Sequence, residues 1–214
     1  MKKFAVVLSG CGVFDGAEIH EATLTLYSIL KNGGSYEIFA PDIEQYHVIN
    51  HITGKEMDET RNVLGESARI ARGKIKSLAA FNAGDFDALI FPGGFGVAKN
   101  LSSLAFKGDE CIVDINVEYA VTSMYKQGKP IGALCIAPSV MAKILKGSMV
   151  TIGNDKKEIA NIEKMGSKHK VTTHGEVVVD EKFKLVTSPC YMLNANILQI
   201  AEGVDNVIKT IMKM

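Results

Sequence analysis

The sequence lacks long apolar runs and an excess of charge of either sign. No stretch of its 214 residues approaches the roughly 18 consecutive apolar residues that a membrane-spanning helix needs. The basic start Met1-Lys2-Lys3 precedes an apolar run far shorter than that of a signal peptide, so we interpret this segment as a first strand. We therefore expect a cytoplasmic protein that does not insert into a membrane.

Basic and acidic residues balance, with 24 of each. Such a chain has no global field that would draw it to nucleic acid. The cysteines, at positions 11, 111, 135 and 190, form no C-x-x-C pair, and no cluster of His and Cys has the spacing of zinc ligands. We expect no nucleic-acid partner, no metal and no cofactor. In a cytosolic chain the thiols should be free and mostly buried.

Short apolar runs alternate with helical patterns, and 47% of the residues are apolar. This alternation predicts an α/β fold: a single domain over residues 1–214 with a mostly parallel, doubly wound sheet, closed by a late hairpin. The expected strands are Phe4–Leu8, Tyr36–Ala40, Ala88–Phe91, Ile131–Leu134, Val150–Ile152, Glu176–Val179 and Leu185–Thr187. Apolar stripes predict helices at Ile19–Leu30, Val117–Met124 and Ile197–Ile211.

The segment 43–78 does not fit this alternation and is interpreted as an insertion. It contains a hairpin-like turn at His51–Glu56 and a helical pattern over Glu59–Arg72. Insertions of this kind often cover the end of the sheet at which ligands bind. A peripheral or dimer-forming flap is the alternative.

Cys135 is the strongest candidate for a reactive residue. The apolar strand Ile131–Leu134 runs directly into it, and Pro138 suits the first turn of a following helix. A residue on such a turn emerges at the carboxyl end of the sheet, as in the nucleophile elbow of hydrolases. The helix start should lower the pKa of the thiol, and the Ile136 N–H should face a developing oxyanion. A small cysteine packed at a strand end is the alternative.

A glycine turn and two acids are the other candidate site residues. Gly93 and Gly94 follow a predicted strand, and the Gly94 N–H is a second candidate oxyanion donor, with a plain tight turn as the alternative. Asp15 is expected to cap the first helix, with Glu18 in the place of a capping-box acid. Either Glu18 or Glu21 could reach the thiol and carry a proton, although helix capping or a solvated surface position would also explain them.

A histidine would normally activate a cysteine nucleophile. None of the five has a position that the sequence ties to Cys135, and surface positions would explain them equally. We consider His51, on the insertion, and His169, before a strand, as the first candidates.

The glycine pattern Gly10-x-Gly12-x-x-x-Gly16 offers a further alternative. A G-x-G-x-x-G turn after a first strand binds pyrophosphate, but the spacing here differs by one residue. Nucleotide binding would also leave the cysteine elbow unexplained.

Taken together, these features resemble a known superfamily. The glycine turn, from Pro92 to Ser102, and the cysteine elbow are similar to those of PfpI-type peptidases and the parkinsonism-associated deglycase. Longer motifs across the chain resemble the ElbB-like family, also called enhancing lycopene biosynthesis protein or sigma cross-reacting protein. These motifs include Val7-Leu8-Ser9-Gly10-Cys11-Gly12, Glu18-Ile19-His20-Glu21-Ala22, Ile49-Asn50-His51-Ile52-Thr53-Gly54 and Cys135-Ile136-Ala137-Pro138.

The resemblance implies a flavodoxin-like three-layer sandwich, one class I glutamine amidotransferase-like domain, a homodimer and a link to isoprenoid biosynthesis. It also implies glyoxalase III-like activity, the glutathione-independent conversion of small 2-oxoaldehydes such as glyoxal to 2-hydroxy acids. Cys135 would be the nucleophile, and Gly94 and Ile136 the oxyanion donors. Counting back from the glycines that end the first helix favours Glu21 over Glu18 as the acid.

Two departures limit what the resemblance implies. PfpI-type peptidases have His directly after the nucleophile, where this chain has Ile136. Glutamine amidotransferases need a His-x-Glu near the C-terminus, and the segment Ser188–Tyr191 lacks it. Amidotransferase and peptidase activities are therefore disfavoured. The alternative to an enzyme is a redox-responsive or stress-responsive regulator that senses oxidants through Cys135.

Overall fold

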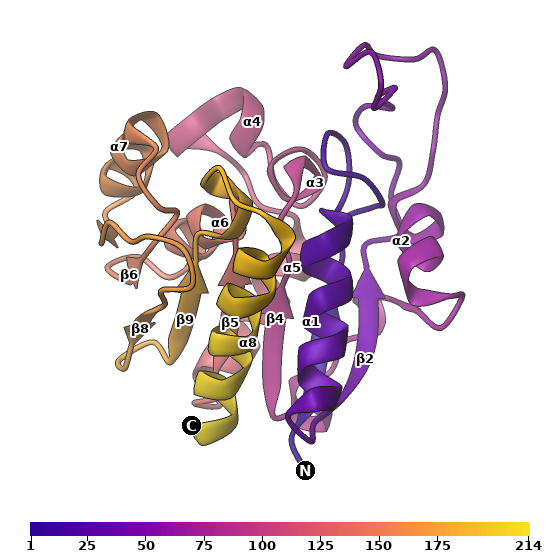
Figure 1. The fold of residues 1–214 in the computed structure, drawn as a ribbon. Coiled ribbons are helices and arrows are strands. Elements are labelled where there is room, and N and C mark those ends of the chain that lie inside the picture. The colour runs from indigo at the N-terminus through magenta and orange to yellow at the C-terminus, as the bar shows by residue number, and fades with distance from the viewer.

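The computed structural model describes residues 1–214 and contains a seven-stranded sheet between two layers of helices (Figure 1). The strand order is β3-β2-β1-β4-β5-β9-β8, and every neighbouring pair is parallel except β8 with β9. The strands are β1 (Lys3–Val7), β2 (Ser35–Ala40), β3 (Lys76–Ser77), β4 (Ala88–Phe91), β5 (Ile131–Leu134), β8 (Val178–Asp180) and β9 (Leu185–Ser188). The predicted α/β sandwich and the late hairpin are thus confirmed.

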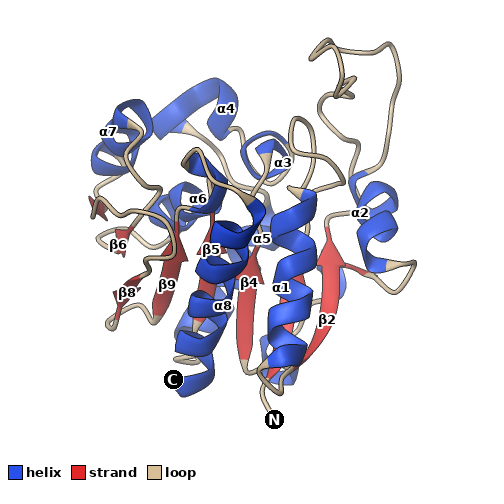
Figure 2. Cartoon of the chain, viewed as in Figure 1, coloured by secondary structure: helices blue, strands red, loops and turns tan.

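The central strands are apolar along their whole length because helices cover both of their faces. Every residue of β4 and β5 is buried. Helices α1 (Ile19–Lys31) and α8 (Ile197–Lys213) cover one face, and α5 (Ile115–Lys126) and α6 (Ala137–Ile144) cover the other (Figure 2). The remaining α-helices are α2 (Val63–Ala71), α3 (Phe95–Lys99), α4 (Leu104–Lys107) and α7 (Lys156–Lys164). None of the helices is both long and apolar enough to span a membrane.

One predicted strand lies outside the main sheet. The expected strand Val150–Ile152 is instead the short β6 (Met149–Val150), which pairs only with β7 (Lys168–His169). Side chains take the place of the backbone ladder there: the Thr151 N–H donates to the Thr187 hydroxyl, and the Met149 N–H donates to a carboxylate of β8. The predicted strand is therefore present in shorter form, but it does not join the seven-stranded sheet.

The ends of two helices also differ from expectation. Glu18, not Asp15, caps α1, and its carboxylate accepts from the Glu21 N–H at 2.7 Å. The expected helix Glu59–Arg72 is shorter, because Asn62 caps its start and Arg72 adopts a left-handed conformation at its end.

The insertion 43–78 packs against the loop that follows β1. The Asp15 carboxylate accepts from the Ile49 N–H at 2.6 Å, and since α1 begins only at Ile19, Asp15 joins the loop to the insertion and does not cap the helix. Asn100 donates to the backbone oxygens of Ser9 and Asp15 and accepts from the Tyr46 N–H at 3.0 Å. The loop after β1, the insertion and the end of α3 are thereby joined at the carboxyl edge of the sheet.

Candidate active site

Cys135 lies in the turn between β5 and α6, as the sequence predicts. Its φ is +59°, in the left-handed region that non-glycine residues rarely adopt. The strand continues into this turn through the Cys135 N–H, which donates to the Ser188 carbonyl of β9 at 3.0 Å. The residue is 7% exposed. The chain therefore holds a cysteine in a strained conformation at the carboxyl edge of the sheet, a feature that recurs at functional sites.

The backbone amides of Gly94 and Ile136 lie beside the Cys135 sulfur and oppose the rise of its pKa. Gly94 has a φ of +101°, and a Cβ there would lie 2.4 Å from both the Glu18 nitrogen and the Gly16 oxygen. Only glycine fits in this position. The two amides predicted to be oxyanion donors thus lie at the thiol.

Glu21 is the acid that the structure brings to Cys135. Its side chain is fully buried beside the Cys135 thiol: a Cβ on Gly93 would lie 2.7 Å from a Glu21 carboxyl oxygen and 3.0 Å from the Cys135 sulfur. One carboxyl oxygen accepts from the Gly93 N–H at 2.9 Å, and the other accepts from the Tyr191 N–H at 3.1 Å. Glu18, at the cap of α1, makes no such contact.

Gly93 makes the close approach of these groups possible. A Cβ at this position would lie 2.3 Å from the Cys135 Cβ and 2.7 Å from a Glu21 carboxyl oxygen. Any side chain would therefore separate the carboxyl group from the thiol.

Burial is the largest influence on the pKa values of Glu21 and Cys135. It raises the pKa of Glu21 to about 8, although the Tyr191 and Gly93 amides oppose the shift. Burial, and then the charge of Glu21, raise the pKa of Cys135 well above its ordinary value, against the hydrogen bonds from Gly94 and Ile136. The predicted lowering of the thiol pKa was thus wrong in direction, because desolvation outweighs the helix start. The two groups are coupled, and ionising one disfavours ionising the other.

Cys190 is a site residue that the sequence reasoning missed. It follows β9 within a short 3₁₀ turn, Cys190–Met192, and is buried with a φ of +41°. It belongs to the same buried cluster as Cys135, and burial, followed by the charge of Glu21, raises the pKa of its thiol well above the ordinary value. The available signal was the strand Leu185–Thr187 running into Pro189-Cys190, which is similar to the strand before Cys135.

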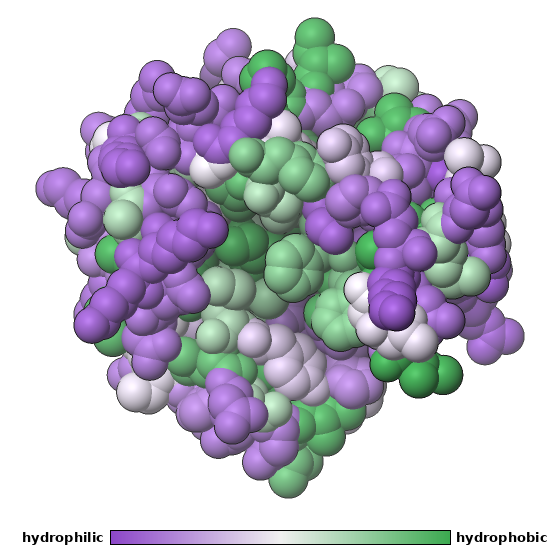
Figure 3. All heavy atoms as spheres, turned by 90° about the horizontal axis from the view of Figure 1, so that it is seen from above, coloured by the Kyte–Doolittle hydropathy of each residue, from purple (hydrophilic) through white to green (hydrophobic).

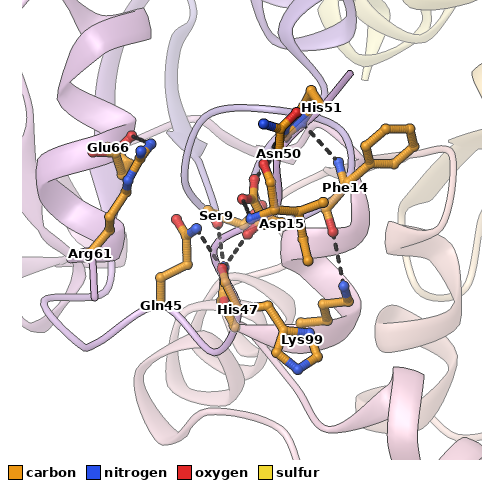
Figure 4. Close-up of polar contacts among 12 residues, drawn as sticks. Ser9, Phe14, Asp15, Gln45, His47, Asn50, His51, Arg61, Glu66 and Lys99 are labelled. Atoms are coloured by element: carbon orange, nitrogen blue, oxygen red, sulfur yellow. Dashed lines mark hydrogen bonds and ion pairs between the residues drawn. The ribbon is translucent and has the colours of Figure 1, made fainter. Parts of the chain in front are cut away.

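His51 lies apart from the thiol group. Its Nε2 accepts from the Phe14 N–H at 3.2 Å, and its Nδ1 donates to the Ile49 carbonyl at 2.9 Å (Figure 4). His51 therefore joins the insertion to the loop after β1, and its suggested role in substrate binding stays a prediction.

Three other histidines make hydrogen bonds elsewhere. His169 accepts from the Ile152 N–H at 3.1 Å, and burial lowers its pKa. His20 lies 2.8 Å from the Tyr191 hydroxyl, and His174 lies 3.1 Å from the Asn194 carbonyl. No hydrogen bond joins a histidine to Cys135. The side chain beside the thiol that can carry a proton is therefore Glu21.

The glycine loop after β1 is folded on itself. The Gly10 N–H donates to the Ser67 hydroxyl, the Gly12 N–H to the Ala17 carbonyl and the Gly16 N–H to the Gly12 carbonyl. Since these amides are already bonded within the protein, the geometry does not favour the nucleotide alternative.

Figure 3 looks onto the carboxyl end of the sheet, where apolar side chains gather around a hollow near the middle of the face. A groove of the surface lies elsewhere. It has a volume of about 960 Å³ between α1, β2 and the turn after α2, and includes none of the predicted site residues. No group of three or more His, Cys, Asp or Glu side chains is arranged to hold a metal ion.

Comparison with known proteins identifies the family. A model of the DJ-1/PfpI family matches residues 13–195. The chain belongs to the DJ-1/PfpI family. This assignment covers both the elbow and the glycine turn, so the predicted superfamily is confirmed at this level.

Two curated relatives cover nearly the whole chain. It is 45% identical to the human "Glutamine amidotransferase-like class 1 domain-containing protein 3, mitochondrial" over 222 residues, covering 99% of this chain and 83% of the relative. It is 34% identical to the zebrafish "ES1 protein, mitochondrial", covering 98% and 85%. These names refer to mitochondrial proteins, so the cytoplasmic location stays a prediction.

Solved structures agree on the fold. An Ehrlichia chaffeensis isoprenoid biosynthesis protein with an amidotransferase-like domain superposes with a TM-score of 0.94 at 35% identity, covering 100% of this chain and 99% of that one. Glyoxalase III from Candida albicans has a TM-score of 0.64 at 14% identity, covering 99% and 96%. At that identity the second likeness shows the fold alone. The flavodoxin-like, three-layer architecture is common to all.

Proposed function

We propose that this chain is a glyoxalase III-like enzyme that converts small 2-oxoaldehydes to 2-hydroxy acids without glutathione. The observation that carries the proposal is the group formed by the Cys135 thiol, two amides aimed at its sulfur and the buried Glu21 carboxyl group. The Candida albicans fold relative bears the name of this activity. We further propose membership of the ElbB-like family, which the isoprenoid biosynthesis name of the Ehrlichia chaffeensis relative supports.

The reaction begins when the Glu21 carboxylate takes the proton of the Cys135 thiol and the sulfur adds to the aldehyde carbon. The negative charge moves from sulfur to the former aldehyde oxygen, within reach of the Gly94 and Ile136 amides. Glu21 gives the proton to this oxygen, and a hemithioacetal forms. A pKa of about 8 suits a carboxyl group that must take and return a proton near neutral pH.

An internal redox step follows. The Glu21 carboxylate removes the hydrogen on the carbon bonded to sulfur, and a proton is returned to the neighbouring carbon. The aldehyde carbon is thereby oxidised to a thioester while the adjacent carbonyl is reduced to a hydroxyl group. Water then cleaves the thioester and releases the 2-hydroxy acid and the thiol. This series of steps needs one group that carries protons, and Glu21 is the group in position for it.

The test is turnover of glyoxal in the absence of glutathione, followed as 2-hydroxy acid formed. We expect Cys135→Ala to lose all turnover and Glu21→Gln to lose at least about 100-fold, the usual contribution of a positioned acid or base. Cys111→Ala, at a buried thiol in the other half of the core, is the matched control. Equal background turnover by wild type and Cys135→Ala would refute the proposal and favour a non-enzymatic regulator. Size-exclusion chromatography of the wild type tests the expected homodimer.

A further inference from the structure

We propose that Cys190 is the resolving thiol of Cys135, so that oxidation of Cys135 by a hydroperoxide ends in an intramolecular Cys135–Cys190 disulfide. The inference shares the reactive thiol of the proposed function but does not require turnover of aldehydes. It concerns a modification site at the end of β9.

The pairing of strands brings the two cysteines together. Cys135 follows β5, Cys190 follows β9, and these strands are parallel neighbours in which Leu134 pairs with Ser188. Adjacent strands lie about 4.8 Å apart, and a disulfide needs Cα atoms about 4.4–6.8 Å apart. Cys190 lies two residues after Ser188 and is buried in the same cluster as Cys135, and the N–H of the next residue, Tyr191, donates to the Glu21 carboxyl group at 3.1 Å.

Backbone conformation marks both cysteines as unusual. Four non-glycine residues in the chain have a positive φ, and two of them are Cys135 at 59° and Cys190 at 41°. Such strain persists where the surrounding structure holds it, and it clusters at functional sites. Arg72 and Lys184, the other two, lie in turns on the protein surface.

The carboxyl group of Glu21 serves both sulfurs. One carboxyl oxygen lies beside the Cys135 sulfur across Gly93, and the other accepts from the Tyr191 N–H, next to Cys190, at 3.1 Å. A group that accepts and releases a proton between two thiols is what disulfide formation requires. Cys111 lacks it, because that thiol is buried on the opposite face of the sheet near Lys143 and Glu158.

The oxidation takes place in two steps. The Glu21 carboxylate takes the proton of the Cys135 thiol, and the sulfur attacks one oxygen of the hydroperoxide. The O–O bond breaks, and a sulfenic acid and an alkoxide form. The alkoxide takes the proton from Glu21 and leaves as alcohol, or as water when the oxidant is hydrogen peroxide. The Cys190 thiol then gives its proton to the Glu21 carboxylate, and its sulfur attacks the sulfenic sulfur. The S–O bond breaks, and the hydroxide takes that proton from Glu21 and leaves as water. Two thiols and one hydroperoxide thus give one disulfide, one alcohol and one water.

The experiment treats the full chain with a small molar excess of hydrogen peroxide, enough to carry a thiol to sulfinic acid, alkylates it under denaturing conditions and maps the peptides by mass spectrometry. We expect the wild type to lose alkylation at Cys135 and Cys190 together and to yield a cross-linked peptide that a dithiol reductant separates. Cys11 and Cys111 stay alkylated. In Cys190→Ser, the peptide of Cys135 should instead gain two oxygen atoms, as sulfinic acid. Cys111→Ser is the matched control and should behave as the wild type does.

A wild type that forms Cys135 sulfinic acid while Cys190 is still alkylated would overturn the inference. This measurement uses the wild type alone, so it tests the inference even if Cys190→Ser folds poorly. Glyoxal turnover of the untreated wild type is measured on the same sample. A disulfide without turnover would refute the proposed function and leave this inference intact, whereas turnover without a disulfide would do the reverse.

Discussion

Replacing Glu21 by Gln should change how stability depends on pH, because the carboxyl group titrates inside the core. The folded protein keeps the Glu21 proton up to a pKa of about 8, whereas the unfolded chain loses it near 4.5. Between these values the native state binds more protons than the unfolded state, so the free energy of unfolding falls by about 1.4 kcal/mol for each pH unit. The contribution is fully present below pH 4.5 and is lost as the pH rises toward 8. Across the difference of about 3.5 pH units, the loss is about 5 kcal/mol.

The stability of the Gln variant lacks this dependence on pH, but the substitution itself destabilises the folded state. Its amide has one acceptor oxygen, while the Glu21 carboxyl group accepts from both Gly93 and Tyr191. One buried N–H is left unpaired, which costs about 1–3 kcal/mol. The variant should therefore be less stable than the wild type in acid and more stable in base, with the two curves crossing between about pH 5 and pH 7.

Urea denaturation from about pH 5 to about pH 8, followed by far-UV circular dichroism, measures both curves. The difference between wild type and variant should fall by about 4 kcal/mol over this range. Glu118→Gln, on the exposed side of α5, is the control for removing a carboxyl group outside the site. Parallel curves for wild type and Glu21→Gln would refute the reasoning, since they would mean that Glu21 is ionised alike in the folded and unfolded chain.

Three further substitutions test the packing around the site. Gly93→Ala should destabilise the fold by about 1–3 kcal/mol and abolish thiol-dependent turnover, because its Cβ would overlap Cys135. Gly65→Ala, where the nearest atom is 3.7 Å away, should leave stability and turnover intact. Equal melting curves for the two variants would contradict this expectation. Asn100→Ala removes three hydrogen bonds to loops and should raise amide hydrogen exchange around Tyr46, and unchanged exchange would count against the described contact. Asp205→Asn should lower the free energy of unfolding by about 1–2 kcal/mol, because hydrogen bonds from Lys209, Asn32 and Lys31 hold the Asp205 pKa at about 2. The effect should fade as the pH drops from about 4 toward 2, and a loss that persists below that range in urea titrations would exclude an ionic origin.

The layers and the elbow could be predicted because they depend on local sequence. A continuous apolar run such as Ala88–Phe91 indicates a strand covered on both faces, whatever its neighbours are. The turn at Cys135 is signalled within four residues by the strand before it and Pro138 after it. The order of strands is not local, so the pairing of β5 with β9 and the nearness of Cys190 were not available from the sequence.

The protonation of the site also depends on long-range packing. The helix start near Cys135 is a local feature and predicts a lowered thiol pKa, but the depth of burial is set by loops far away in the chain. The role of Asp15 is similar, since its partner Ile49 belongs to the insertion. The choice of Glu21 over Glu18 agrees with counting along the helix, yet the amides that bind it come from Gly93 and Tyr191.

The amide contacts of Glu21 have a consequence for how the protein acquires its chemistry. This carboxyl group, from the first helix, is held by backbone near the middle of the chain and by backbone only 23 residues before the C-terminus. During synthesis the acid and the thiol are made long before the last of these contacts exists. A ribosome-bound chain that stops short of residue 191 would carry both groups without their mutual arrangement, so reactivity should arise late, when the final strand and helix dock.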